Sequence, residues 1–527
     1  MRRTLLKRII VPLAVLGAFT PSAEARDLNN VELFRRCYAQ LTGRALKPND
    51  SRIAGLQSGS LNPVTECLAV LDRARINPND AQGRLVNPTD AEGLAVLRRL
   101  YKVYSGFISA PTARSLSNFF EDFPATEDVY DFTSPALAYT ENTLNPNRSF
   151  KDLFTITRTP AAKREIDTTV VYPFTLNWIY GGSHSTTTNV YSPRSRYGFA
   201  FSPAGTNPDS VPVSLMYYAS STPTREDQNL AMIEVGELVG IHYNSPQQII
   251  RTSNSGVTNI QGIPLNFDMN TTLFAGIPFL RTYVIANTNL IAGNNPRPNL
   301  DAMPRRLSRS IMHDFLCREL PVIRASDAAS FVSTDTNANA FRKGSSCVRC
   351  HATIDPMAGV YRGVGYISAG DFQSDVLHRY ALHVHKSAPV TGFSAESGWP
   401  AAKDNDYFKR PATGRLYYRN LSGALVNVAV ANGDELSARL SEQDDVYVCQ
   451  ARKLFQYFTG VRVDLNDIYD PDEAAALAAM SEKDWEYRNL VIQLGKNLKK
   501  HQKVRQTIEE ILKLEIYRRT DFGAGSL

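Results

Sequence analysis

The sequence lacks an apolar run long enough to cross a membrane, and it lacks a large excess of one charge. A membrane-spanning helix needs about 18 uninterrupted apolar residues, and the nearest approach, 274–292, is broken by Arg281 and several Asn. We therefore predict no transmembrane anchor, while peripheral association with a cell envelope stays open. The formal charge of +6 falls to +3 once the four cations and one acid of residues 1–25 are removed. Such a balance argues against nucleic acid as a partner.

Cysteine and histidine are also scarce, with 6 and 8 among 527 residues, which makes their one close grouping informative. Cys347-Val-Arg-Cys350-His351 has the order and spacing of a covalent haem c attachment site. In such a site the two thiols add across the porphyrin vinyl groups, and the His that follows binds the iron. The sequence therefore predicts one haem c, held by Cys347 and Cys350, with His351 as the proximal iron ligand.

Two other kinds of site contain a C-x-x-C pair. One is a thiol–disulfide redox pair, and the other is half of a zinc site followed by a coincidental His. A zinc site needs a second Cys/His pair at ligand spacing, and the sequence shows none. Haem c is the favoured interpretation, and the two alternatives stay open.

The first 25 residues have the pattern of a secretory signal peptide. Four cations occupy the first eight residues, Ile9 to Phe19 is apolar, and Ala23-Glu24-Ala25 resembles a cleavage site. We expect a mature chain that begins near Arg26 and is exported to the periplasm or cell surface. Arg2-Arg3 resembles a twin-arginine signal for folded proteins, which we disfavour because haem c is normally attached to an unfolded, translocated chain.

The four remaining cysteines, Cys37, Cys67, Cys317 and Cys449, are an even number in a chain expected to reach an oxidising compartment. Four cysteines allow three pairings. We favour Cys37 with Cys67 and Cys317 with Cys449, because each pair falls within one expected packing unit. Buried unpaired thiols are the alternative.

Hydrophobic periodicity predicts an α+β protein that is predominantly helical. Residues 26–130 are expected to form a helical N-terminal domain, in which Asn30 caps a first helix ended by Gly43 and Asn62-Pro63 begins a second. Residues 131–303 are rich in Thr, Asn, Ser, Pro and Gly, and predict a loop-rich mixed central domain.

Residues 304–527 are expected to form a cytochrome c-like haem domain with further helices toward the C-terminus. One helix follows an apolar stripe from Tyr447 to Phe458 and ends at Gly460. A short β insertion is expected around 380–385, where alternation places His383 and His385 on one side of an extended segment.

The haem motif and its surroundings resemble the planctomycete-type secreted cytochrome family. The resemblance is strongest at Cys347 to His351, which is followed by Ala-Thr-Ile354-Asp355-Pro356. It extends in pieces to 309–317 upstream and to 432–436 and 449–460 downstream. Two departures are Phe341-Arg342, where the family commonly has His-Arg, and a Gly displaced to position 359. The resemblance implies an exported cytochrome-like protein with one haem.

The ligand on the second face of the iron decides what such a haem does. The favoured candidates are Met357, close to the motif, and His383. A Met ligand would raise the reduction potential relative to a pair of His ligands. The other candidates are His378, His385, Met303, Met312 and His313.

Three functions follow from these expectations. The first is a c-type cytochrome that transfers single electrons with an unidentified redox partner protein. The second is a haem enzyme resembling a peroxidase, with an open iron position, although two-haem peroxidases would need a second C-x-x-C-H that the sequence does not contain. The third is a surface binding protein in which the haem is structural.

Overall fold

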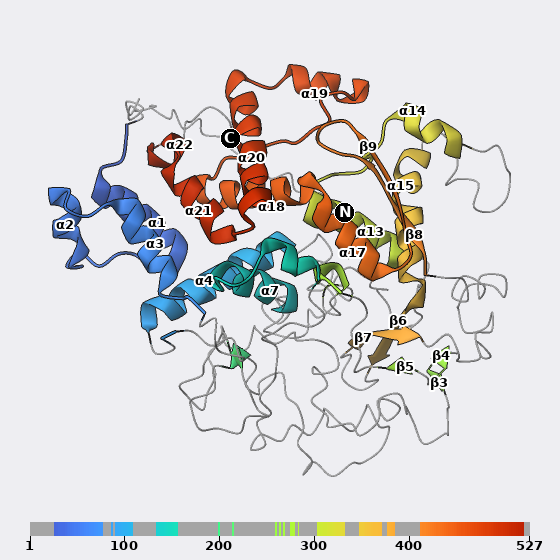
Figure 1. The fold of residues 1–527 in the computed structure, drawn as a ribbon, viewed down its shortest axis with the longest axis horizontal. Helices are drawn as coiled ribbons and strands as arrows, with labels where there is room; N and C mark the ends of the chain where they lie inside the picture. The colour runs from blue at the N-terminus through green and yellow to red at the C-terminus, as the bar shows by residue number, and fades with distance from the viewer. Residues whose placement is uncertain are drawn as a thin grey trace, which may run out of the picture.

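The computed structural model shows a predominantly helical protein with several small sheets, as predicted (Figure 1). It describes residues 26–76, 86–87, 90–108, 133–155, 199–200, 213–214, 259–260, 263–264, 267–268, 275–279, 283, 303–332, 347–370, 377–384 and 412–520. The expected signal peptide, the Phe341-Arg342 pair and His385 lie outside these residues, as does most of the expected central domain.

Four helices follow the first described residues: α1 (Asn30–Thr42), α2 (Arg52–Ser58), α3 (Pro63–Asp72) and α4 (Ala91–Ile108). The cap of α1 is Asn29 rather than Asn30. Asn29 is extended, its side chain accepts from the N–H of Glu32, and the Glu32 carboxylate accepts in return from the N–H of Asn29. Gly43 ends α1 at φ +67°, and Asn62 caps α3 with Pro63 in its first turn, both as predicted.

A helix also opens the region that was expected to be loop-rich. It is α7 (Thr133–Leu144), followed by the 3-10 helix η2 (Phe150–Phe154). The rings of Tyr104 and Tyr139 stack with centroids 5.3 Å apart, and the Tyr104 hydroxyl shares a hydrogen bond with Thr143. Aromatic packing against α4 thus supports α7 despite its three Thr residues and one Asn.

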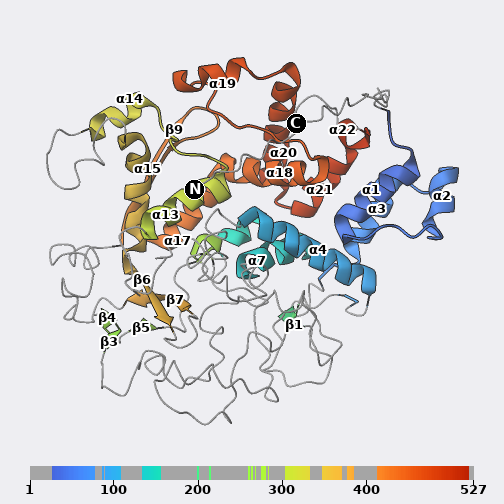
Figure 2. The same cartoon turned by 180° about the vertical axis from the view of Figure 1, so that it is seen from behind.

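The second half of the described chain is built on α13 (Met303–Leu316), which lies between α15 (Val348–Ala358) and α18 (Asp444–Thr459) in both views (Figure 2). Helices α18 and α20 (Glu482–His501) pack closely at Gly495. A side chain there would not fit, since an added Cβ would lie 2.5 Å from the Cα of Val448. The remaining helices are α14 (Ala325–Ala328), α17 (Gly433–Glu442), α19 (Ala474–Ala478), α21 (Val504–Lys513) and α22 (Glu515–Arg518), with η4 (Ile277–Phe279), η5 (Ala329–Phe331), η7 (Gly359–Gly363) and η9 (Pro471–Glu473).

Among the described residues, the strands form four small sheets. The largest has the order β5-β7-β6 and is antiparallel. In its register, His383 of β7 lies opposite Val364 of β6. A second antiparallel pair, β8 with β9, adjoins α15, since the Gly414 backbone approaches Pro356 closely. The bounds are β1 Phe199–Ala200, β2 Val213–Ser214, β3 Asn259–Ile260, β4 Ile263–Pro264, β5 Phe267–Asp268, β6 Val364–Gly370, β7 Leu377–Val384, β8 Gly414–Arg419 and β9 Leu425–Val430.

One continuous hydrophobic core contains residues from all three of the expected domains, among them Phe34, Tyr139 and Phe455. Two disulfides brace it, Cys37–Cys67 and Cys317–Cys449, which are the pairs the sequence favoured. No helix of the described part is long and apolar enough to cross a membrane.

The two ends of the described chain pair with each other. The N–H of Leu28 donates to the carbonyl of Arg518 over 2.7 Å, and the N–H of Thr520 donates to the carbonyl of Arg26 over 2.8 Å. An antiparallel bridge joins Asp27 and Arg519 between them. This places α22 beside α1 (Figure 1).

Candidate haem attachment site

The C-x-x-C-H motif forms the first turn of α15. Cys347 is its N-cap, and its carbonyl accepts from the N–H groups of Cys350, at 3.2 Å, and His351, at 3.1 Å. Residues three and four apart lie on the same side of a helix. The two thiols and the imidazole therefore project from one face of one helical turn, as attachment of a single planar group requires.

The two thiols differ from the other four cysteines in their bonding. Both are partly exposed, and neither takes part in either disulfide. Burial is the main reason that the pKa of the Cys350 thiol is raised above its usual value, with the Arg349 guanidinium opposing the shift. Sulfurs on an accessible helical turn fit the donor set of a covalently held haem, whose iron His351 would bind.

A charged chain of contacts extends from His351. Its Nδ1 lies 3.0 Å from Oδ1 of Asp355, one turn further along α15, and the same carboxylate oxygen lies 2.9 Å from Nε of Arg305 on α13. An ionised carboxylate can only accept, so Nδ1 carries the proton. In the neutral imidazole, Nε2 is then the ring nitrogen that can bind a metal.

Arg349, between the two cysteines, anchors the turn to the rest of the protein. Its guanidinium donates to the carbonyl of Ile323 through Nε, at 3.1 Å, and Nη2, at 3.0 Å. It also pairs with Asp470 at 3.0 Å and with Asp472. The Arg349 side chain therefore holds the motif turn against Ile323, Asp470 and Asp472.

Met357, a favoured ligand for the second face of the iron, is a core residue in this structure. It lies on the same helix as His351, six residues on, and its side chain is fully buried. Serving as a ligand would require it to leave the core. Helix α15 continues without a break through Pro356, so the segment from His351 to Met357 does not turn back over the motif.

The other candidates fall in different places. His383 and His378 lie in β7, as register partners of Val364 and Ala369 of β6. Met312 is buried in the core. His313 lies at the opposite end of α13 from Arg305, where its ring contacts Asp314 at 2.8 Å and Glu319 at 3.3 Å. Within the described ranges, no three His, Cys, Asp or Glu side chains gather so as to hold a metal ion.

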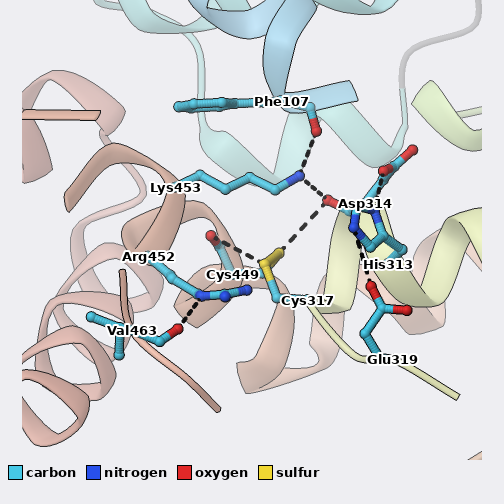
Figure 3. Close-up of a disulfide and its surroundings, with 9 residues drawn as sticks. All are labelled: Phe107, His313, Asp314, Cys317, Glu319, Cys449, Arg452, Lys453 and Val463. Atoms are coloured by element: carbon cyan, nitrogen blue, oxygen red, sulfur yellow. Dashed lines mark hydrogen bonds and ion pairs between the residues drawn. A yellow bond between two sulfur atoms is a disulfide. The ribbon is translucent and has the colours of Figure 1, made fainter. Parts of the chain in front are cut away.

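The opposite end of α13 holds a second cluster of sulfur and charge, shown in Figure 3. The Cys317–Cys449 disulfide joins α13 to α18. Beside it the Lys453 ammonium donates to the carbonyls of Phe107, at 2.7 Å, and Asp314, at 2.6 Å. Burial lowers the pKa of Lys453 to about 8, and the Asp314 carboxylate only partly opposes this.

Asp355, Arg305 and Arg349 are site residues that sequence reasoning did not single out. Asp355 had a signal, since it follows His351 by four residues on a helix. Arg349 had none beyond its place in the motif, and Arg305 is on another helix. No protein-family model, curated protein or solved structure matches this chain.

Proposed function

We propose that the protein is an exported c-type cytochrome that passes single electrons between partner proteins through one haem, attached at Cys347 and Cys350. The observation that carries this proposal is the first turn of α15, where two accessible thiols and His351 share one face. A bound haem would supply an iron that cycles between two oxidation states. This chain would supply the two thioether links, the His351 ligand and the Arg349 contacts that hold the motif turn in place.

Export is supported by a different set of residues. Disulfides persist mainly in oxidising compartments, and the structure contains two. The signal-like residues 1–25 would carry the chain to such a compartment, the periplasm or cell surface. There the haem could be attached before the chain folds.

Covalent haem is the property to test first. The full chain, with its own residues 1–25, would be produced in a bacterium that has haem c maturation machinery. We expect the purified protein to give a pyridine haemochrome spectrum of one haem c and to keep its haem stain after denaturing electrophoresis. Cys347→Ala with Cys350→Ala should abolish the stain.

The matched control removes the other kind of cysteine. Cys37→Ala with Cys67→Ala should keep the haem stain, because a denaturing gel reports the covalent link and not the fold. A colourless wild-type protein, or staining unchanged in the Cys347 and Cys350 variant, would refute the proposal.

A second candidate function is a haem enzyme with one open iron position, resembling a peroxidase. The burial of Met357 in the core favours it, because a nearby ligand for the second face is then engaged elsewhere. Absorption and electron spin resonance spectra separate the two candidates. A six-coordinate low-spin iron supports electron transfer, whereas a high-spin iron that binds cyanide and consumes peroxide supports catalysis.

A further inference from the structure

The proposed iron ligand is the first member of a three-residue contact chain. His351 Nδ1 contacts Asp355 Oδ1 at 3.0 Å, and Arg305 Nε contacts the same oxygen at 2.9 Å. The side chains are 20%, 33% and 24% exposed, in the order His351, Asp355, Arg305. The chain thus runs from one helix to another while remaining partly screened from solvent.

We propose that Asp355 positions His351 and sets the reduction potential of the haem, and that Arg305 limits the size of this effect. The inference rests on the proposed function. A His that binds a metal through one nitrogen commonly donates its other N–H to a carboxylate, which fixes the tautomer and ring orientation and makes the His a stronger electron donor. A stronger donor stabilises Fe(III) relative to Fe(II), so Asp355 lowers the potential.

Arg305 acts in the opposite direction because it binds the oxygen that accepts from His351. Its positive charge draws electron density from Asp355 and weakens the acceptor. Removing Arg305 leaves Asp355 with a full charge to direct at the imidazole. The two residues are therefore expected to shift the potential with opposite signs.

A merely structural ion pair would behave differently. A partly exposed ion pair contributes little to stability, and loss of either partner would loosen the same contact between α13 and α15. Both substitutions would then change the reduction potential in the same direction. Opposite shifts in potential are a result that a structural role does not produce.

The experiment is a spectroelectrochemical titration of the purified, haem-loaded full chain. We expect Asp355→Asn to raise the midpoint potential and Arg305→Gln to lower it, with one haem per chain in each. Asp355→Glu, which keeps a carboxylate one turn from His351, should return the potential toward that of the wild type. This conservative variant keeps the test decisive if Asp355→Asn folds poorly.

Two matched controls remove the same charges elsewhere. Asp472→Asn deletes a carboxylate that pairs with Arg349 in the motif turn, and Arg306→Gln deletes the next cation on α13; in the described part neither residue contacts His351 or Asp355. Both should shift the potential less than their counterparts do. Shifts of equal size in variants and controls, or of the same sign for Asp355→Asn and Arg305→Gln, would overturn the inference while leaving the haem itself in place. A wild-type protein without covalent haem would instead refute the proposed function.

Discussion

The two ends of α13 use the same residue types in opposite ways. The motif end comprises Arg305 with Cys347, Cys350, His351 and Asp355, and the disulfide end comprises His313 and Asp314 with Cys317–Cys449 and Lys453. A His contacts an Asp at each end, at 3.0 Å in the first and 2.8 Å in the second. At the disulfide end the sulfurs are cross-linked and the buried ammonium donates to main-chain carbonyls. At the motif end the sulfurs are not cross-linked, and His351 and Arg305 both contact the carboxylate of Asp355.

The difference teaches that residue type alone does not mark a reactive site. Cys317, directly after α13, and Cys449 in α18 are 132 residues apart in sequence and are joined by a disulfide. Cys347 and Cys350 share one turn of α15, and both are partly exposed. Spacing within one helical turn, together with the lack of a disulfide, distinguishes Cys347 and Cys350 from the cysteines that stabilise the fold.

The largest expected effect comes from the disulfide end. Cys317→Ser with Cys449→Ser should reduce the free energy of unfolding by about 2–5 kcal/mol, because the cross-link restricts a long loop in the unfolded chain. Cys347→Ser with Cys350→Ser should change that of the haem-free chain by less than about 1 kcal/mol. Urea unfolding of both double variants measures this. Equal losses of unfolding free energy in the two double variants would contradict the expected difference between the two ends of α13.

The next effect is a pH dependence arising from Lys453. Its folded pKa of about 8 lies below the usual 10.5, so between these values the unfolded chain holds a proton that the folded chain has released. Stability therefore rises with pH across that interval, by on the order of 3 kcal/mol. Lys453→Met should abolish the rise, whereas Lys500→Met, an exposed lysine of α20, should keep it. Unfolding by urea at pH 7 to 10.5 provides the measurement.

A third prediction concerns the stability that the contacts of Arg349 give to the motif end. Arg349→Met removes its bonds to Ile323 and Asp470 and should lower the free energy of unfolding by about 1–3 kcal/mol. Arg349→Lys should recover little, since an ammonium cannot reproduce the forked geometry. Arg415→Met removes an exposed Arg of β8 and should cost under about 0.5 kcal/mol. A similar cost at both positions would mean that the motif turn needs no anchor.

The smallest expected effect concerns the two His–Asp contacts. His313 is 41% exposed, and His313→Gln should change the free energy of unfolding by less than about 1 kcal/mol and leave the haem spectrum unchanged. His351→Gln should change the spectrum while the thioether links remain. Thermal unfolding and absorption spectra of the two variants would separate the contacts, and a spectral change in His313→Gln would contradict the division between the ends.

Local signals in the sequence predicted much of the fold. Pro63 after Asn62 and the glycines at 43 and 460 marked helix ends that the structure contains. Both disulfides followed from the expected packing units. The cap at Asn29 was placed one residue late, because two adjacent Asn have equal capping chemistry and only the backbone shape selects between them.

What could not be predicted depends on contacts between distant residues. Helix α7 is stabilised by Tyr139 stacking on Tyr104, which composition does not reveal. Arg305 reaches Asp355 across 50 positions because α13 and α15 pack side by side. The burial of Met357 likewise depends on which face of α15 meets the core. The motif could therefore be read from the sequence, but its surroundings could not.

The pairing of residues 26–28 with 518–520 sets an order on the assembly of this protein. A chain still being synthesised cannot form this pairing until residues 518–520 have emerged. The motif at Cys347 therefore emerges before residues 26–28 can pair with residues 518–520. If the chain carries a haem as we propose, the haem would be attached in the interval before residues 518–520 pair with residues 26–28.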